Sequence, residues 1–231
     1  MNASADDNDQ IHTCSPEEQR QAELAEAAAN AAMVTHVLPP RDRIFLPQTW
    51  RERVVAFWWS VVRSTMFRWS LPAMNRWRVF LLRMFGARIE RGVHIEPSVR
   101  IEFPWNLSVG KDTVLCDRVI INCMGRVSIG RSTRISQYSH VISGTHDYHS
   151  TDMHIERRPI TIGHNVWVAA DAFVGPGVTL GDGCLLAARS SAFRDLPAGQ
   201  VCVGEPARPV HARFAANGLV DSPGPTVADA R

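Results

Sequence analysis

The chain has 231 residues, of which 45% are hydrophobic and 21% charged, with a formal net charge of +2. The length suffices for one sizeable domain with additional segments, and the hydrophobic share excludes a chain disordered throughout. No run of 18 uncharged apolar residues occurs, which argues against a transmembrane helix, and the first 40 residues lack the pattern of a secretory signal. We therefore expect a cytoplasmic protein. The five cysteines show no C-x-x-C spacing, which indicates reduced thiols rather than a disulfide or zinc framework.

The charges are unevenly distributed along the chain. Residues 1–40 hold seven acidic residues and one arginine, whereas residues 41–85 hold nine arginines and two acidic residues, and the remainder is near neutral. A basic segment of this kind suits the phosphates of a nucleic acid or of a membrane surface. No recognition motif for nucleic acid accompanies the arginines, so no nucleic-acid partner is expected.

Residues 1–45 are predicted to form an acidic, largely disordered tail with one short helix. Ser15 is a capping residue, Pro16 suits the first helical position, and Glu18 completes a capping box before an alanine-rich stretch that runs to about Met33. Because this helix has little apolar surface to bury, it is expected to be marginally stable. A proline-rich linker follows it.

Residues 46–86 are predicted to form amphipathic helices rich in tryptophan and arginine. Apolar residues recur at helical spacing over 50–69, Pro72 ends this helix, and a second helix over 75–85 stops at Gly86. The second helix is expected to place these side chains on one face: Trp77, Phe80, Leu81, Met84 and Phe85. Two interpretations remain open. The helices either pack on the main domain or anchor the protein at a lipid surface, because Trp and Arg on amphipathic helices suit the headgroup boundary.

From residue 87 the apolar spacing changes to a period of six. Fourteen of fifteen lead positions are Ile, Val or Leu: Ile89, Ile95, Ile101, Val109, Leu115, Ile121, Ile129, Ile135, Val141, Ile162, Val168, Val174, Leu180, Leu186 and Ala192. Small or branched residues recur four positions after the lead residues. Each hexad predicts a short strand and a turn, and three hexads make one coil of a parallel β-helix. The sequence thus predicts an all-β solenoid over residues 87–213 with an N-terminal helical extension, a 143–159 loop and a flexible tail over 214–231.

Several short motifs resemble those of a known protein family. They include Pro104-Trp105-Asn106-Leu107, Ile135-Ser136-Gln137, Gly144-Thr145-His146-Asp147-Tyr148, Trp167-Val168-Ala169-Ala170 and Gly204-Glu205-Pro206-Ala207. Over about residues 45–213 the chain resembles the left-handed β-helix acyltransferases with hexapeptide repeats, and in particular the colanic acid biosynthesis O-acetyltransferase family. The resemblance implies a left-handed helix, a homotrimer with active sites between neighbouring subunits, acetyl-CoA as co-substrate and a hydroxyl group of a sugar or small molecule as acceptor.

The break in the hexad period between Val141 and Ile162 holds the candidate catalytic residues. A hydroxyl group has a very high pKa, so its attack on a thioester requires a neutral imidazole to take the proton. His146 lies seventeen residues after Ile129, the spacing that the catalytic histidine has in galactoside and maltose acetyltransferases, and is the predicted base. Asp147 either holds the tautomer of this imidazole or caps the loop.

The remaining site residues follow from the resemblance. It implies that acetyl-CoA lies along the coils after the loop, with these contacts: Trp167, Ala170, Ala188, and, near the phosphates, Arg194 and Arg208. The alternative interpretation is that the two arginines are solvated surface residues without a ligand. The substrate-binding asparagine of the family falls on Cys116, and Asn122, one hexad later, is the alternative acceptor contact. A family threonine is replaced here by Phe193.

A metal site is not expected. His149 and His154 have the spacing of zinc ligands in the γ-class carbonic anhydrases, but Thr113 stands where a third ligand would be needed.

The predicted function is acetyl-CoA-dependent O-acetylation of a sugar hydroxyl in the synthesis of an exopolysaccharide or another surface polysaccharide. The saccharide acceptor is lipid-linked in one version of this hypothesis, with peripheral contact to the anionic inner face of the plasma membrane. Two alternatives remain open: an acetyltransferase for a small soluble acceptor such as serine or a free sugar, and a non-catalytic or metal-binding β-helix protein.

Overall fold

The computed structural model describes residues 21, 49–149 and 151–214. The chain divides into two units, residues 1–43 and 44–231, and the fold given below is that of the second unit. The predicted acidic tail with its short helix lies outside the described residues apart from Gln21, as does the predicted C-terminal tail apart from Phe214. In the described part of the chain, no helix has the length and apolar character needed to cross a membrane.

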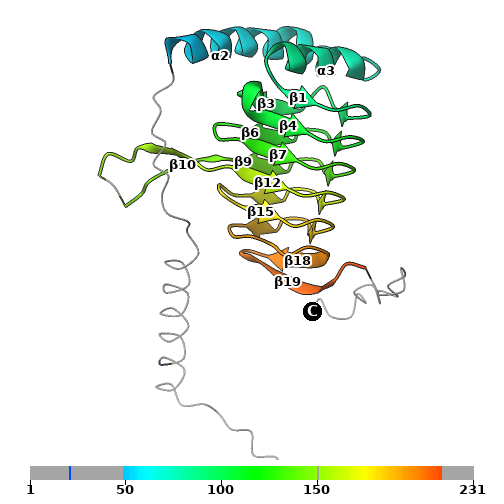
Figure 1. The fold of residues 1–231 in the computed structure, drawn as a ribbon, viewed down its shortest axis with the longest axis vertical. Coiled ribbons are helices and arrows are strands. Elements are labelled where there is room, and N and C mark those ends of the chain that lie inside the picture. The colour runs from blue at the N-terminus through cyan, green and yellow to red at the C-terminus, as the bar shows by residue number, and fades with distance from the viewer. Residues whose placement is uncertain (1–20, 22–48, 150, 215–231) are drawn as a thin grey trace, which may run out of the picture. The chain divides into compact units, whose positions relative to one another are not determined.

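Residues 88–192 form a left-handed parallel β-helix, which confirms the predicted fold (Figure 1). Equivalent strands of five successive coils pair in parallel into three sheets. Sheet A contains β1 (Arg88–Ile89), β4 (Leu107–Val109), β7 (Val127–Ile129), β12 (Ile160–Ile162) and β15 (Thr179–Leu180). Sheet B contains β2 (His94–Ile95), β5 (Val114–Leu115), β8 (Arg134–Ile135), β13 (Trp167–Val168) and β16 (Leu185–Leu186), followed by β18 (Gln200–Gly204) and the antiparallel β19 (Ala207–Ala212). Sheet C contains β3 (Arg100–Glu102), β6 (Ile120–Asn122), β9 (His140–Ile142), β14 (Phe173–Val174) and β17 (Ser191–Ala192).

The lead residues of the hexads form the core. All fifteen are buried, and the pairing register stacks them directly, as in the Ile89–Val109–Ile129 ladder of sheet A. After the lead residues of sheets A and B, the residues four positions later, such as Val93 and Thr113, are buried as well. Each short strand therefore contributes its lead side chain to an apolar stack that runs from coil to coil. Burial of this stack is the main stabilising term of the β-helix.

The backbone conformation at the corners between the sheets explains which residue types follow the strands. Between sheets A and B, the residue three positions after each lead residue has a positive φ in every coil, as at Asp112 (57°) and Asn165 (53°). A short polar side chain or glycine tolerates this left-handed conformation. At Gly130 the reason is space, because a Cβ atom would lie 2.4 Å from the carbonyl oxygen of Gly163 on the next coil.

Three helical segments lie across the N-terminal end of the β-helix (Figure 1). They are α2 (Trp50–Val62), the π-helical η1 (Arg63–Phe67) and α3 (Asn75–Met84), as the sequence predicts. Thr49 and Glu52 form a capping box at the start of α2. Trp59 is buried and its Nε1 donates a hydrogen bond of 2.8 Å to the carbonyl oxygen of Ile101. The helices therefore pack on the first coil.

The buried face of α3 differs from the predicted one. Leu81 is buried, but Phe80 and Met84 are 50% and 65% exposed, and Arg78 and Leu82 are buried in their place. The guanidinium of Arg78 bonds backbone carbonyls and a hydroxyl group, which permits its burial. An apolar pattern alone could not identify this face, because α3 carries apolar residues on two sides.

The predicted 143–159 loop contains two strands. After β9 the chain leaves the coil as an antiparallel hairpin of β10 (Gly144–His146) and β11 (Ile155–Arg157), which projects from the side of the β-helix (Figure 1). We call residues 144–157 the arm. A short 3-10 turn, η2 (Pro104–Asn106), occupies the equivalent corner of the first coil.

Candidate active site

The arm is held to the β-helix at its root. Ser143 is buried, its carbonyl oxygen accepts from the backbone N–H of Arg158 at 2.8 Å, and its Oγ accepts from the backbone N–H of Gly125 at 2.9 Å. These bonds join the two ends of the arm to each other and to the preceding coil. The position of β10 relative to sheet C is therefore defined, although the arm itself lies away from the core.

His146 is the last residue of β10 and is exposed in the single chain. Its Nδ1 lies 2.6 Å from the carbonyl oxygen of Met153 across the hairpin. A carbonyl oxygen can only accept, so Nδ1 carries the proton and Nε2 presents a lone pair. This is the tautomer that a general base requires, held by the backbone of the same arm.

The contacts of Asp147 favour the role of capping the loop over that of holding the imidazole of the candidate base, His146. Its side chain is 8% exposed, and its Oδ1 accepts from the backbone N–H of His149 at 3.0 Å. Its own backbone N–H donates to the carbonyl oxygen of His154, whose ring Nε2 lies 3.9 Å from Asp147 Oδ2. Asp147 thus links both strands of the arm next to the residue that carries the candidate base.

Asp147, His154 and Glu156 form a cluster that has the composition of a metal site, because one ligand atom of each lies within 4.8 Å of the others. Glu156 accepts from Arg158 Nε at 2.8 Å and from Nη2 at 2.6 Å, and His154 Nδ1 lies 2.9 Å from Asp152 Oδ1. An arginine on the carboxylate supplies the positive charge that a cation would otherwise supply. We interpret the cluster as a hydrogen-bonded network that stabilises the arm.

The two candidate acceptor contacts lie at different corners. Asn122 ends β6 at the corner between sheets C and A, where the arm departs one coil later, and its Nδ2 donates to Glu102 at 2.9 Å while its Oδ1 accepts from the backbone of Met124. Cys116 follows β5 at the corner between sheets B and C, and burial raises the pKa of its thiol. Asn122 is therefore the candidate on the same edge as His146.

The small residues predicted to contact acetyl-CoA form a column. Ala170 follows β13 and Ala188 follows β16, so both lie at the corner between sheets B and C, and the backbone N–H of Arg189 bonds the carbonyl oxygen of Ala170 at 3.0 Å. Ala170 is half-buried and Ala188 is exposed. The column provides a surface without bulky side chains. It lies across sheet C from the corner at which the arm departs.

Trp167 lies on β13 and is 41% exposed, with its Nε1 2.9 Å from Ser136 Oγ. It lines a shallow hollow of about 470 Å³ together with these residues: Ser132, Arg134, Asn165, Val166, Arg213 and Phe214. Sequence reasoning missed Arg213, which donates to the carbonyl oxygens of Asn165, Gly183 and Cys184. It lies after the last hexad, so no periodicity marks it.

The predicted phosphate-binding arginines lie at the C-terminal end. Arg208 is exposed on β19, and the turn before it is tied to the last coil, since the backbone N–H of Gly204 donates to Ser190 Oγ at 3.0 Å. Arg194 is half-buried and follows β17. Both lie beyond the alanine column in the direction of the C-terminus.

The Met153 carbonyl was also not identified from the sequence as a contact of His146, because a backbone acceptor leaves no signal in residue type.

Comparisons with known proteins identify the family and the fold. A scan against protein-family models finds no match. The chain is 47% identical over 153 residues to WcaF of Escherichia coli strain K12, which is named a colanic acid biosynthesis acetyltransferase, and the alignment covers 66% of this chain and 84% of WcaF. It is 26% identical over 148 residues to galactoside O-acetyltransferase of the same strain, over 62% of this chain and 71% of that one.

Solved structures match the fold. A galactoside acetyltransferase in complex with coenzyme A has a TM-score of 0.67 at 22% identity, over 76% of this chain and 92% of that chain. The hexapeptide-repeat acetyltransferase VCA0836 of Vibrio cholerae has a TM-score of 0.66 at 21% identity, over 72% and 95%. The identity to WcaF extends over most of that protein's length. The chain belongs to the colanic acid biosynthesis acetyltransferase family and is a hexapeptide-repeat acetyltransferase.

Proposed function

We propose that the protein transfers the acetyl group of acetyl-CoA to a hydroxyl group of a saccharide during the synthesis of a surface polysaccharide. The observation that carries the proposal is the hydrogen bond of 2.6 Å between His146 Nδ1 and the Met153 carbonyl oxygen, which leaves Nε2 as a proton acceptor. WcaF is named for colanic acid biosynthesis, and a solved relative contains coenzyme A, which supports the choice of acceptor and donor.

The chemistry assigned to His146 is general base and then general acid catalysis. Nε2 takes the proton of the acceptor hydroxyl group as its oxygen bonds the thioester carbonyl carbon. The resulting imidazolium returns this proton to the sulfur of coenzyme A as the carbon–sulfur bond breaks. Met153 holds the ring in one orientation throughout, and Asp147 keeps the two strands of the arm together.

The protein is proposed to act as a homotrimer. His146 projects from the edge between sheets C and A, whereas Ala170 and Ala188 form their column at the edge between sheets B and C. The width of sheet C separates the two groups within one chain. A neighbouring β-helix packed against this edge would bring the arm of one subunit to the column of the next, and so complete the site.

Acetyl-CoA is proposed to lie along the alanine column, with its phosphates near Arg194 and Arg208. Small side chains and exposed backbone groups suit the narrow pantetheine arm, and guanidinium groups suit phosphates in charge and geometry. Trp167 would border the thioester end. Asn122, at the edge from which the arm departs, is the proposed acceptor contact in preference to Cys116. The reaction is assigned to the cytoplasm, at the face of the membrane where a lipid-linked saccharide would be available.

The test is acetyl transfer by His146 variants. His146→Ala is expected to lower kcat by roughly 10²- to 10⁴-fold, the contribution of a general base. His146→Asn retains a side-chain donor for the Met153 carbonyl but has no base, so it should be equally slow. His149→Ala, in the same arm, is the matched control. Release of the thiol of coenzyme A and mass spectrometry of the surface glycan from cells with and without the gene are the measurements.

Near-normal kcat in correctly assembled His146→Asn would contradict the base assignment. Thiol release with serine or a free sugar, together with an unchanged surface glycan, would favour a small soluble acceptor. An active monomer in sedimentation would contradict the shared site.

A further inference from the structure

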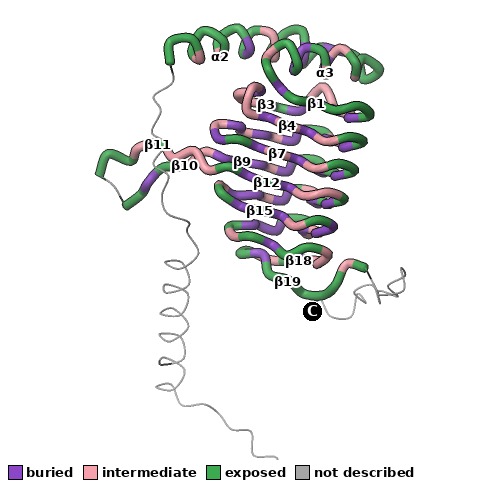
Figure 2. The backbone as a smooth tube through the Cα atoms, in the orientation of Figure 1, coloured by how far each residue is buried: buried purple, intermediate pink, exposed green. Residues whose placement is uncertain are grey.

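The helical segments carry an apolar surface that the β-helix does not cover. Twelve of the 21 exposed large hydrophobic side chains of the described residues lie between residues 49 and 84: Trp50, Val54, Val55, Phe57, Trp58, Val61, Met66, Trp69, Leu71, Met74, Phe80 and Met84. Most of α2 is exposed along its length (Figure 2). Scattered exposed apolar residues are ordinary, but the concentration of so many in one short stretch of the chain indicates a binding surface.

The exposed side chains of α2 follow from helical geometry. Glu52, Ala56 and Trp59 recur at intervals of four and three and lie toward the first coil, where only Trp59 is fully buried. The opposite side of α2 has the same spacing and is more apolar. It carries Trp50, Val54, Phe57, Trp58 and Val61, which we call the outward face. In water such a face is normally turned toward a core, so its exposure requires a partner.

The charges around the outward face have one sign. Arg51 and Arg53 flank it on either side of α2, and Arg68 and Arg76 are exposed in the segments that follow. The one acidic residue between positions 49 and 88 is Glu52, whose carboxylate accepts from the backbone N–H of Thr49. The surface therefore combines aromatic side chains with a net positive charge.

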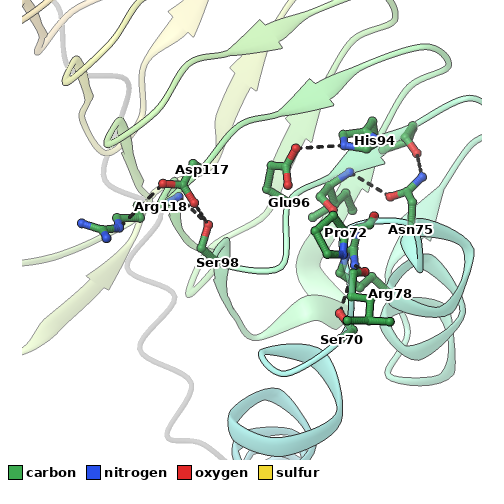
Figure 3. Close-up of polar contacts among 12 residues, drawn as sticks. Ser70, Pro72, Asn75, Arg78, His94, Glu96, Ser98, Asp117 and Arg118 are labelled. Atoms are coloured by element: carbon green, nitrogen blue, oxygen red, sulfur yellow. Dashed lines mark hydrogen bonds and ion pairs between the residues drawn. The ribbon is translucent and has the colours of Figure 1, made fainter.

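The helical segments are fixed to the first coil, so the outward face has a defined direction. Asn75 donates to the carbonyl oxygen of Val93 and accepts from the backbone N–H of Ile95, both within 3 Å (Figure 3). Arg78 bonds the Ile95 carbonyl at 2.7 Å and the Pro72 carbonyl at 2.8 Å (Figure 3). On α2, Trp59 is buried and bonds the Ile101 carbonyl from the side opposite to the outward face, so the outward face points away from the β-helix.

We propose that the outward face binds the surface of an anionic lipid bilayer. Trp and Phe rings insert at the level of the headgroups, where their amphipathic rings are most stable, and arginine guanidinium groups bond lipid phosphates. Both terms act together, because the arginines flank the aromatic side chains. The segments lie on the bilayer while the β-helix extends from it toward the aqueous phase.

A second copy of the chain fits this surface less well. In a two-fold contact the same face meets itself, which would bring Arg51 and Arg53 of one copy close to those of the other without acidic partners. The acidic tail of residues 1–40 has the complementary charge but lies outside the described residues. Charge and aromatic content together match anionic lipid.

Binding to the bilayer would place the active site near a lipid-linked acceptor. This consequence rests on the proposed function. The arm departs after β9, two strand spacings of about 4.8 Å from β3 on the first coil. A saccharide attached to a lipid in the same bilayer would then be presented near His146. Vesicle binding itself does not depend on catalysis.

The experiment is sedimentation of the full-length protein with vesicles, without acetyl-CoA. Vesicles of phosphatidylcholine are compared with vesicles of phosphatidylcholine mixed with phosphatidylglycerol, at low and high salt. One variant combines Trp50→Ser, Phe57→Ser and Trp58→Ser, and another combines Arg51→Gln, Arg53→Gln and Arg68→Gln. The matched control combines Arg118→Gln with Tyr138→Ser, an exposed arginine and aromatic ring 5.4 Å apart on the β-helix.

Wild-type and control protein are expected to bind the phosphatidylglycerol vesicles at low salt and to dissociate at high salt. The aromatic variant should bind at least tenfold more weakly, and each arginine removed should weaken binding about fivefold. Absence of wild-type binding at low salt, or unchanged binding by the aromatic variant, overturns the proposal. So does a lower oligomer mass of the aromatic variant, which would identify the face as a subunit interface.

Discussion

Arg78→Met tests whether a buried arginine holds the helical segments on the β-helix. Arg78 is 0% exposed, and burial lowers the pKa of its guanidinium. It donates to the carbonyl oxygens of Ile95, Leu71 and Pro72 at 2.7, 2.7 and 2.8 Å, and to Ser70 Oγ at 3.0 Å. Methionine is unbranched and apolar, so it fills much of the same space but donates no hydrogen bond.

The loss of stability in Arg78→Met is the sum of the free-energy costs at the acceptors that lose their donor. The Ile95 carbonyl belongs to a fully buried residue, and an unsatisfied buried acceptor costs about 1–3 kcal/mol. Leu71 and Pro72 are exposed, so water can replace the donor at their carbonyls at about 0.5–1 kcal/mol each. Ser70 keeps its bond to the Phe67 carbonyl. Relief from burying a charge offsets part of this loss, and the net destabilisation is about 3 kcal/mol.

Hydrogen exchange measured by mass spectrometry reports this loss locally. Peptides from α3 should exchange about a hundredfold faster in Arg78→Met, because each 1.36 kcal/mol corresponds to about tenfold. Peptides from the later coils, such as the one containing β13, should be unaffected. Arg76→Met makes the same substitution on the exposed side of α3 and should leave exchange unchanged.

Equal protection of α3 in wild-type protein and Arg78→Met would refute the idea that the buried Arg78 holds the helical segments on the first coil. A loss of protection in Arg76→Met as large as in Arg78→Met would attribute the effect to helix propensity or overall charge instead.

Three further predictions concern packing, pH dependence and donor binding. Gly130→Ala should lower stability by about 1–3 kcal/mol, because its Cβ would lie 2.4 Å from the Gly163 carbonyl oxygen; an unchanged thermal midpoint, with Ser128→Ala as control, would contradict this close approach. Burial raises the pKa of Cys184 from 9.0 to about 12, so the native thiol keeps its proton at pH values where the thiol of the unfolded chain loses it. The free energy of unfolding should therefore fall as pH rises from 9.0 toward 12. Urea titrations should show a smaller fall in Cys184→Ala, and an identical fall would argue against Cys184 as the source. Arg194→Gln combined with Arg208→Gln should raise KM for acetyl-CoA by about tenfold with little change in kcat; an effect on kcat alone would count against phosphate binding.

The register of the β-helix could be predicted because it depends on local pattern. Within each coil the buried lead residues are six positions apart. The sequence spacing therefore predicts which residues stack on one another, as Ile89, Val109 and Ile129 do in sheet A. The break in this interval marked the arm, apolar residues at helical spacing marked α2, and Pro72 marked the end of the helical stretch that begins with it. His146 was identified as the candidate base because it lies seventeen residues after Ile129, a spacing that resembles that of galactoside and maltose acetyltransferases.

The tertiary structure decided which groups the arm and the helices contact. The tautomer of His146 depends on a backbone carbonyl across the hairpin, which residue type does not encode, and the separation of Asn122 from Cys116 depends on the corner at which each strand ends. On α3, two apolar sides compete for the first coil. The side with Arg78 is the buried one, because carbonyl groups of the Ser70–Pro72 turn and of β2 meet there and satisfy the guanidinium, which no apolar periodicity records.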